Sequence, residues 1–282
     1  MNLAVIDTRI GAPSSRELME RALDPYMLLG MPHLTPTGLS ETWLMKELGH
    51  RHWIMLARHL QMENADFRTG DGGEAYASIC ATALRDADFS RARANDILEI
   101  RSSLTALSRN QHSSRHRLQI GTLSICDVEI VSAFIIRRRP GDNHALMRAE
   151  PCRDAPARYG ESALAQRASA IRRGQFDAQT GLPHDGQATL LARLVPDARE
   201  DFNGAGLLYF AHFQRFFSGT LEAAMPGSFV GSRQREMFFL GNIAIGEAVE
   251  INLLRGPPDD ARLLCNMVRQ DGKVIAYASN GP

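Results

Sequence analysis

The stretch DFNGAGLLYFAHFQRFF, residues 201–217, places a polar turn with two glycines directly before a segment crowded with aromatic residues. The whole chain contains only five tyrosines and twelve phenylalanines, so this concentration needs a structural reason. Phe210, Phe213 and Phe217 recur at three- and four-residue spacing, which puts them on one face of a helix. The spacing predicts an apolar helix over residues 207–225 whose aromatic face fills the concave side of a sheet.

The composition is that of an ordinary globular protein of one large domain or two of roughly 140 residues. Of its 282 residues 44% are hydrophobic and 23% are charged, and the formal net charge is zero. A neutral chain offers no bulk attraction to nucleic acid or to an anionic membrane. We find neither a signal peptide nor a transmembrane segment, and we expect a cytoplasmic protein.

The cysteines and histidines do not form a metal-binding pattern. Cys80, Cys126, Cys152 and Cys265 are far apart in the chain, as expected for buried thiols in a reducing compartment. The histidines of residues 50–59 lack a nearby carboxylate that would complete a ligand set. We therefore expect no metal.

Two halves of the chain share one order of predicted elements, namely strand, helix and about four antiparallel strands. In the first half a periodic apolar helix covers residues 39–60, and Gly49 and His50 are expected to bend or break it. Strand-like runs follow at residues 76–84, 97–104, 116–125 and 128–136. In the second half a strand at residues 190–195 and the helix over 207–225 precede strands at 236–240, 243–254, 263–269 and 274–278.

The repeated order predicts an α+β double hotdog, in which each of two long helices is wrapped by an antiparallel sheet. Local echoes support the duplication: residues 37–40 resemble 205–208, and residues 95–100 resemble 246–251. We expect an N-terminal arm over residues 1–22 and a linker over residues 141–186 with a short helix near 161–173. The two hotdog domains would cover residues 23–140 and 187–282.

The turn before the second helix resembles a thioesterase signature. Residues 203–210, NGAGLLYF, are similar to the Asp-Pro-Ala-Gly-x-x-Tyr-Phe pattern of 4-hydroxybenzoyl-CoA-type thioesterases. Asn203 stands where that family has an acidic residue. An amide cannot act as a carboxylate nucleophile or general base, although it can donate a hydrogen bond.

The first half resembles a more specific family. Residues 30–34 (GMPHL), 38–41 (GLSE) and 48–53 (LGHRHW) are similar to the N-terminal hotdog of the leinamycin-type bifunctional acyltransferase/decarboxylase family of polyketide assembly lines. The resemblance extends over most of residues 24–136 and 187–280. It implies decarboxylation of methylmalonyl-CoA and delivery of the acyl group to an acyl carrier protein, with the CoA thioester as substrate and no further cofactor.

The same resemblance implies a catalytic tyrosine. Residues 72–78, GGEAYAS, match the context of that family's active-site tyrosine, which assigns to Tyr76 the role of nucleophile or proton donor. A phenol needs an activating neighbour before it can be acylated. The sequence does not identify that neighbour.

The remaining predicted site residues lie at the starts of the two helices. A helix start offers free backbone N–H groups to the enolate oxygen that decarboxylation produces, and glycine permits a close approach. The predicted oxyanion and substrate-binding residues are His33, Gly38, Ser40, Asn203 and Gly206. We expect both helix starts to face one slot beside Tyr76.

Other interpretations remain open at this stage. The chain could be a dehydratase or thioesterase for carrier-bound acyl chains, which would need a histidine paired with an acid, such as His33 with Asp201 or Glu222. It could also be a non-catalytic protein that binds acyl thioesters. Arg137, Arg138 and Arg139 form either a solvated strand end or a patch facing the phosphate of a coenzyme or carrier arm. We expect a homodimer formed through outer strands.

Overall fold

The computed structural model describes residues 12–151, 158–176, 188–226, 233–254 and 263–281. Residues 1–11 of the expected N-terminal arm, residues 152–157 and 177–186 of the expected linker, and Cys152 lie outside this part of the chain. The described remainder of the arm contains a helix, α1 (Ser15–Ala22), which Ser14 and Glu17 cap reciprocally.

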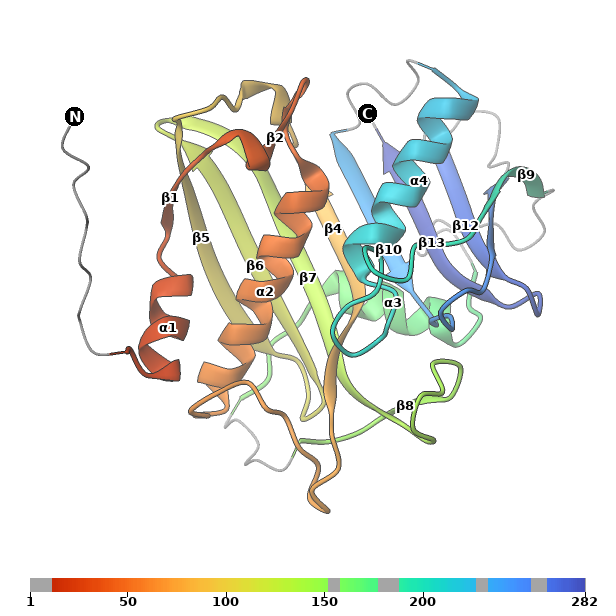
Figure 1. Ribbon diagram of the computed structural model, residues 1–282, viewed down its shortest axis with the longest axis horizontal. Coiled ribbons are helices and arrows are strands. Elements are labelled where there is room, and N and C mark those ends of the chain that lie inside the picture. The colour runs from red at the N-terminus through yellow and green to blue at the C-terminus, as the bar shows by residue number, and fades with distance from the viewer. Residues whose placement is uncertain (1–11, 152–157, 177–187, 227–232, 255–262, 282) are drawn as a thin grey trace, which may run out of the picture.

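One antiparallel sheet runs through the molecule and carries eleven strands in the described part of the chain (Figure 1). Its first half consists of β1 (Tyr26–Leu28), β4 (Tyr76–Arg85), β5 (Ile97–Ala106), β6 (Gln111–Ile120), β7 (Leu123–Arg137) and β8 (Leu146–Arg148). Its second half consists of β9 (Ala188–Leu194), β10 (Gln234–Phe239), β11 (Val249–Leu254), β12 (Leu263–Arg269) and β13 (Val274–Gly281). A separate small hairpin pairs β2 (Leu34–Thr35) with β3 (Gly38–Leu39).

The strand order repeats between the two halves. It is β1-β5-β6-β7-β4 in the first half and β9-β11-β12-β13-β10 in the second, and β4 pairs with β10 at the centre. Helix α2 (Glu41–His59) follows β1, and helix α4 (Phe210–Ala224) follows β9. The chain is therefore a double hotdog, which confirms the predicted fold class.

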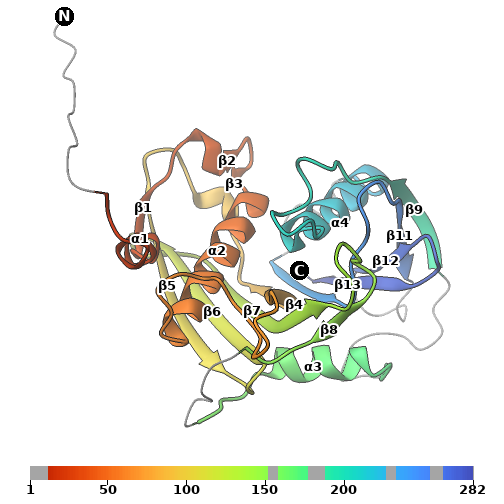
Figure 2. The same ribbon diagram turned by 60° about the horizontal axis from the view of Figure 1, so that its bottom comes forward.

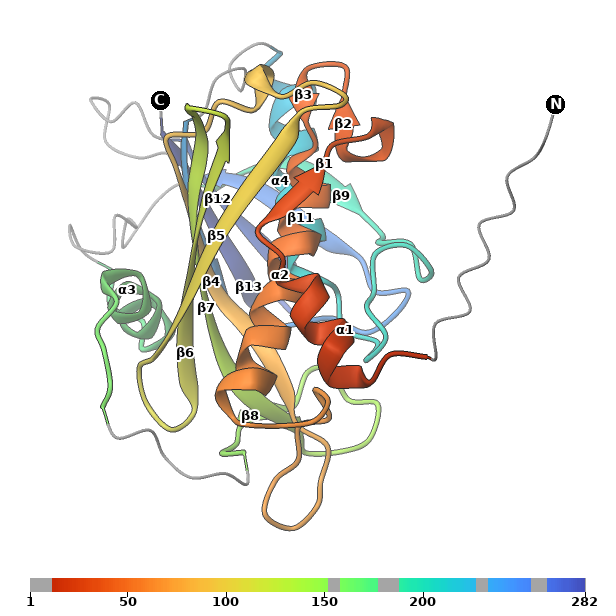
Figure 3. The ribbon, with the colours of Figure 1, turned by 90° about the vertical axis from the view of Figure 1, so that its left-hand side faces the viewer.

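The helices cover the two faces of the sheet unequally. Both α2 and α4 lie on one face, and α3 (Ala163–Arg172) lies on the other (Figure 3). The largest hydrophobic cluster fills the space between α2, α4 and the sheet, and it contains the fully buried rings of Phe213 and Phe217. A second cluster lies beneath α3, where Leu164 and Ile171 pack against small residues of β4 and β7.

Helix α2 is continuous, so the expected break at Gly49 and His50 is wrong. Ser40 begins the helix by accepting a hydrogen bond from the Trp43 backbone N–H. Gly49 lies where α4 begins: a Cβ atom there would come within 2.6 Å of the Phe210 ring and 2.8 Å of the Tyr209 hydroxyl. The absence of a side chain at Gly49 therefore allows the two helices to pack closely together.

The two long helices run antiparallel. The middle of α2 meets the start of α4 at Gly49, and Met45 of α2 lies with Phe210 and Gln214 of α4 around a small cavity. Glu41, the first residue of α2, and Phe210, the first residue of α4, line that same small cavity, and the helices run from there in opposite directions (Figure 1). Among the described residues, those at the start of α2 do not line the larger cavity that contains Tyr76, so the two helix starts do not share one slot there.

Several predicted boundaries also need correction. The runs expected at residues 116–125 and 128–136 form β6 and β7, which meet in a turn at Gly121 with a φ of +59°. Residues 243–248 are a loop that leads into β11. Helix α4 begins at Phe210, so Gly206 lies in the turn before it rather than at its first residue.

The two half-sheets are joined along only part of β4 and β10. Pairing runs from Arg235 opposite Leu84 to Phe238 opposite Ala81. The pairing of β4 with its other neighbour, β7, shifts register between Ile79 and Ala81, so Cys80 forms a bulge. From this point to Tyr76, β4 is no longer paired with β10.

Buried histidines form a polar chain between α2 and the sheet. His52 contacts the hydroxyls of Ser114 at 2.6 Å and Ser132 at 2.7 Å. His116 contacts Ser114 and Ser102, each at 2.8 Å. Burial lowers the pKa of His52 and of His116 to about 3. Both imidazoles are therefore neutral in the folded protein at neutral pH.

We predict that Gly49→Ala destabilises the protein by about 1–3 kcal/mol, because the added methyl group overlaps the Phe210 ring. Urea unfolding would measure this change. Gly219→Ala in α4 is the matched control, since a Cβ atom there meets nothing within 4 Å and alanine is favoured over glycine in a helix by up to about 1 kcal/mol. Equal effects of the two substitutions would contradict the role assigned to Gly49.

We also predict that the free energy of unfolding falls as the pH is lowered from 6.5 to 4. Below pH 6.5 the unfolded chain protonates His52 and His116, whereas the native state does not until about pH 3. Each such histidine contributes a slope of about 1.4 kcal/mol per pH unit in this range. Urea unfolding at successive pH values should show a smaller slope for His52→Gln than for the unsubstituted protein, and an equal slope would contradict the assignment.

Candidate active site

A cavity of about 250 Å³ opens where β4 and β10 part. Its wall is formed by residues of β4, the end of β7, the loop through β8, the segment before and into α4, and the loop after β10. These lining residues include Tyr76, Ser78, Cys80, Asn143, His144, Arg148, Arg172, Asn203, Leu208, Tyr209, Phe210, Phe213, Phe239, Asn242, Arg269 and Lys273.

The cavity reaches both faces of the sheet. Phe210, Phe213 and Phe239 belong to the cluster beneath α2 and α4. Cys80 and Ala133 belong to the cluster beneath α3, on the other face. A cavity lined from both clusters passes between the two half-sheets at their unpaired end.

Tyr76 stands in this wall with two charged neighbours. Its hydroxyl donates to Glu74 Oε2 at 2.5 Å and accepts from Arg137 Nη1 at 3.1 Å. Partial burial and the Glu74 carboxylate raise the pKa of the phenol, while Arg137 opposes them. The phenol is therefore protonated at neutral pH, with an acceptor for its proton and a cation for its phenolate already in contact.

Arg137 is fixed by Asn143, in the loop between β7 and β8, and by the turn before α4. Asn143 Oδ1 accepts from Arg137 Nε at 3.1 Å and from Nη2 at 2.9 Å, and the Ala205 carbonyl accepts from Nη2 as well. Asn143 Nδ2 donates to the carbonyls of Gly206 at 2.6 Å and Ile243 at 2.8 Å. Arg137 therefore ties Tyr76 to the turn before α4, whereas Arg138 and Arg139 are exposed.

The start of α4 is open toward the cavity. Asn203 Oδ1 accepts from the backbone N–H groups of Ala205 and Leu207, each at 3.1 Å, which shapes the turn. No side chain caps the N-terminus of α4, and Phe210, its first residue, lines the cavity. Uncapped N–H groups and the positive end of the helix dipole favour negative charge at this position.

The structure brings only part of the predicted site together. Tyr76 and Asn203 line the same cavity, and Gly206 lies beside it in contact with Asn143. His33, Gly38 and Ser40 lie at the start of α2, and none of the three lines this cavity.

Each of these three residues has a local structural contact. His33 Nδ1 accepts from the Gly30 N–H at 2.9 Å, and its ring lies 4.6 Å from that of Trp43. Gly38, with a φ of +122°, packs directly against the backbone of Phe89.

The equivalent position at the start of α2 is closed. Glu41, the first residue of α2, forms an ion pair with Arg235 of β10, and Arg235 Nε also donates to Asn280 Oδ1 at 2.6 Å. The space lined by Glu41, Arg235 and Phe210 is about 10 Å³, whereas the cavity that Phe210 lines together with Tyr76 is about 250 Å³. The repeat is thus symmetric in its fold and asymmetric in its cavities.

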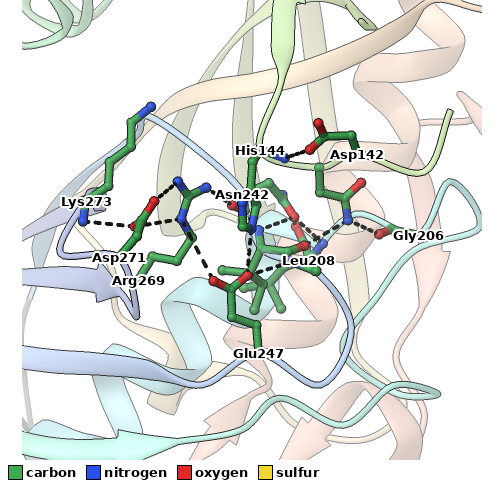
Figure 4. A network of polar contacts seen from close by, with 12 residues as sticks. Asp142, His144, Gly206, Leu208, Asn242, Glu247, Arg269, Asp271 and Lys273 are labelled. Atoms are coloured by element: carbon green, nitrogen blue, oxygen red, sulfur yellow. Dashed lines mark hydrogen bonds and ion pairs between the residues drawn. The ribbon is translucent and has the colours of Figure 1, made fainter. Parts of the chain in front are cut away.

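A histidine and a glutamate that the sequence analysis did not single out meet at the cavity (Figure 4). His144 Nε2 lies 2.7 Å from Glu247 Oε2, and His144 lines the cavity. Glu247 also accepts from the Ala244 N–H and lies 4.0 Å from Arg269 Nε. The two residues are about a hundred positions apart, so no local motif could have indicated the pair.

Asp201 is paired elsewhere. Its carboxylate contacts His212 Nδ1 and Arg215 Nη2, the latter at 2.5 Å, and accepts from the Asp197 N–H at 2.7 Å. Burial disfavours the charge, but these three donors outweigh it and lower the pKa of Asp201. The acid therefore braces α4 and does not meet His33.

No helix in the described ranges is long and apolar enough to cross a membrane. No protein-family model matches the sequence, and no curated protein sequence matches it.

Solved structures are similar over most of the chain. An acyl-ACP thioesterase from Bacteroides thetaiotaomicron is 10% identical, with 90% of this chain and 95% of that chain covered at a TM-score of 0.59. The 12:0-ACP thioesterase from Umbellularia californica is 8% identical, with 91% and 95% covered at a TM-score of 0.57. At such identities the likeness establishes the fold alone, the double hotdog.

Proposed function

We propose that this chain is an acyl-thioester enzyme that decarboxylates a malonyl-type thioester and passes the resulting acyl group to an acyl carrier protein. The observation that carries the proposal is the Tyr76 hydroxyl, held between Glu74 and Arg137 in the wall of a cavity that an uncapped helix start also lines. The acyl-ACP thioesterases of the same fold support acyl thioesters as the substrate class.

The decarboxylation step needs stabilisation of an enolate. The bond between the α-carbon and the carboxylate breaks, and carbon dioxide leaves. The electron pair of the broken bond moves onto the thioester oxygen and forms the enolate. The start of α4 provides uncapped N–H groups for that oxygen, and losing one such donor typically costs about 3–4 kcal/mol of transition-state stabilisation. Tyr76 then gives its proton to the α-carbon, which leaves a phenolate beside Arg137.

The phenolate is the nucleophile of the transfer step. Its oxygen attacks the thioester carbonyl, the coenzyme leaves as a thiolate, and the acyl group becomes an ester on Tyr76. The carrier thiol then attacks this ester, and Tyr76 recovers a proton as the acyl thioester of the carrier forms. In this sequence Tyr76 acts first as proton donor and then as acyl acceptor, and the neighbours that the phenol needs are Glu74 and Arg137.

Tyr76→Phe should lower acyl transfer by about 100-fold or more, because it removes both the proton and the acyl acceptor. Mass spectrometry of a carrier protein after incubation with methylmalonyl-CoA measures the product. Tyr277→Phe is the matched control, since Tyr277 packs beside Phe176 in the cluster beneath α3 and does not line the cavity. Undiminished transfer by Tyr76→Phe would refute the assigned role.

The His144–Glu247 pair favours a second candidate function, a dehydratase or thioesterase acting on carrier-bound acyl chains. A histidine oriented by a carboxylate is a general base for removing an α-proton or activating water. His144 meets this requirement at the cavity, whereas His33, the histidine expected for that role, does not line it.

His144→Gln distinguishes the two functions. If the chain is a dehydratase or thioesterase, the wild-type protein converts 3-hydroxyacyl or saturated acyl carriers, and His144→Gln loses about 100-fold or more of this activity while Tyr76→Phe retains it. Mass spectrometry of the acyl carriers reads out both reactions. His50→Gln, on the exposed face of α2, controls for loss of a histidine. Absence of turnover on both substrate types would refute this candidate.

A further inference from the structure

The cavity has an uneven charge. Among the described residues that line it are Arg148, Arg172, Arg269 and Lys273, and none is an aspartate or a glutamate. The chain as a whole carries 32 basic and 32 acidic residues, so this lining is a local departure from neutrality. An excess of positive charge in a concave site attracts anions.

Arg148 and Arg172 are neighbours among these cations. Arg269 is neutralised by an ion pair with Asp271. For Arg148 and Arg172 the described ranges hold no carboxylate within ion-pair distance. Burial lowers the pKa of Arg172, and the charge of Arg148 lowers it further. Two neighbouring guanidinium groups without an acid are favourable when an anion lies between them.

Arg172 is already positioned. It extends from the last turn of α3, where Nη2 donates to the Phe239 carbonyl at 2.8 Å and Nη1 to the Leu240 carbonyl at 3.3 Å. Arg148 extends from β8, which pairs with β7. Arg148 lies opposite Ile135 of β7, which in turn lies opposite Tyr76 of β4. Both cations lower the pKa of the Cys80 thiol, which burial raises. Figure 2 shows α3 beneath the sheet, on the face away from α4.

We propose that Arg148 and Arg172 bind the phosphate at the end of a pantetheine arm, and that the arm extends through the cavity to present its thioester to Tyr76. Coenzyme A and a carrier protein both have this phosphate. The assignment rests on the proposed function for the thioester end, and on the charge and position of the two arginines for the phosphate end.

A phosphate suits these arginines better than the substrate's own carboxylate. Ion pairs to the carboxylate would stabilise the ground state of a decarboxylation, because the negative charge leaves that group in the transition state. The step proceeds more readily when the carboxylate is in apolar surroundings, such as those of Phe210 and Phe213. A phosphate keeps its charge throughout the reaction, so its binding does not oppose the chemistry.

The test compares the binding of pantetheine and 4′-phosphopantetheine by isothermal titration calorimetry. The full chain should bind the phosphorylated compound at least about tenfold more tightly, and Arg148→Ala and Arg172→Gln should abolish most of the difference. Arg173→Ala is the matched control: its guanidinium contacts Gln175, it neighbours Arg172 and it does not line the cavity. Circular dichroism on heating checks that each variant is folded.

Three results would overturn the assignment. One is equal binding of the two compounds by the unsubstituted protein, and another is a phosphate preference that survives Arg148→Ala. The third is that the arginine substitutions weaken the binding of coenzyme A but not that of a phosphopantetheinylated carrier protein, since this would place the arginines at the nucleotide of coenzyme A. Equal weakening of binding with both ligands supports the proposal. These binding measurements need no turnover, so they can fail or succeed independently of the acyl-transfer assay.

Discussion

The short pairing of β4 with β10 is the constraint on which the rest of the structure depends. Among the described strands, this pairing joins the two half-sheets, from Leu84 opposite Arg235 to Ala81 opposite Phe238. The bulge at Cys80 marks where β4 leaves its partner, and the cavity begins there. A longer ladder would fill the space between the half-sheets with backbone hydrogen bonds, so the site exists because the central pairing stops early.

Arg137 uses this opening to connect the two repeats. It extends from the end of β7 and reaches Tyr76 on one side and, with Asn143, the turn before α4 on the other. The contact with Ala205 joins the first half of the chain to the second, and the contact with Tyr76 lies at the cavity between the two halves. The phenol and the helix start therefore keep their relative positions through a few charge-assisted hydrogen bonds, which are stronger than neutral ones.

Much of the fold could be predicted from the sequence, because both halves show the same order of segments with periodic apolar residues. The helix over Glu41–His59 and the strand Leu263–Arg269 follow that pattern closely. Gly49 misled the prediction because local propensity treats glycine as a helix breaker, whereas its role here is set by Phe210, 161 positions later. The antiparallel course of the two helices also depends on the twofold relation of the repeats, which no local pattern contains.

The candidate site was predictable only where a motif carried it. Tyr76 and Asn203 lie in recognisable short motifs, and both line the cavity. Arg137, Asn143, His144 and Glu247 each contact a residue between 61 and 103 positions away. Such contacts follow from how β7, the loop before β8 and the turn before α4 converge, which is a property of the folded chain.

The closed end at Glu41 and Arg235 has a consequence for how the two copies of the repeat can diverge. There the buried ion pair closes the space beside α2, so substitutions of Glu41 or Arg235 alter folding stability first. In the wall of the larger cavity, a substitution alters the shape of the cavity. Substitutions that alter specificity can therefore accumulate around the larger cavity while the packing around Glu41 and Arg235 keeps the fold stable.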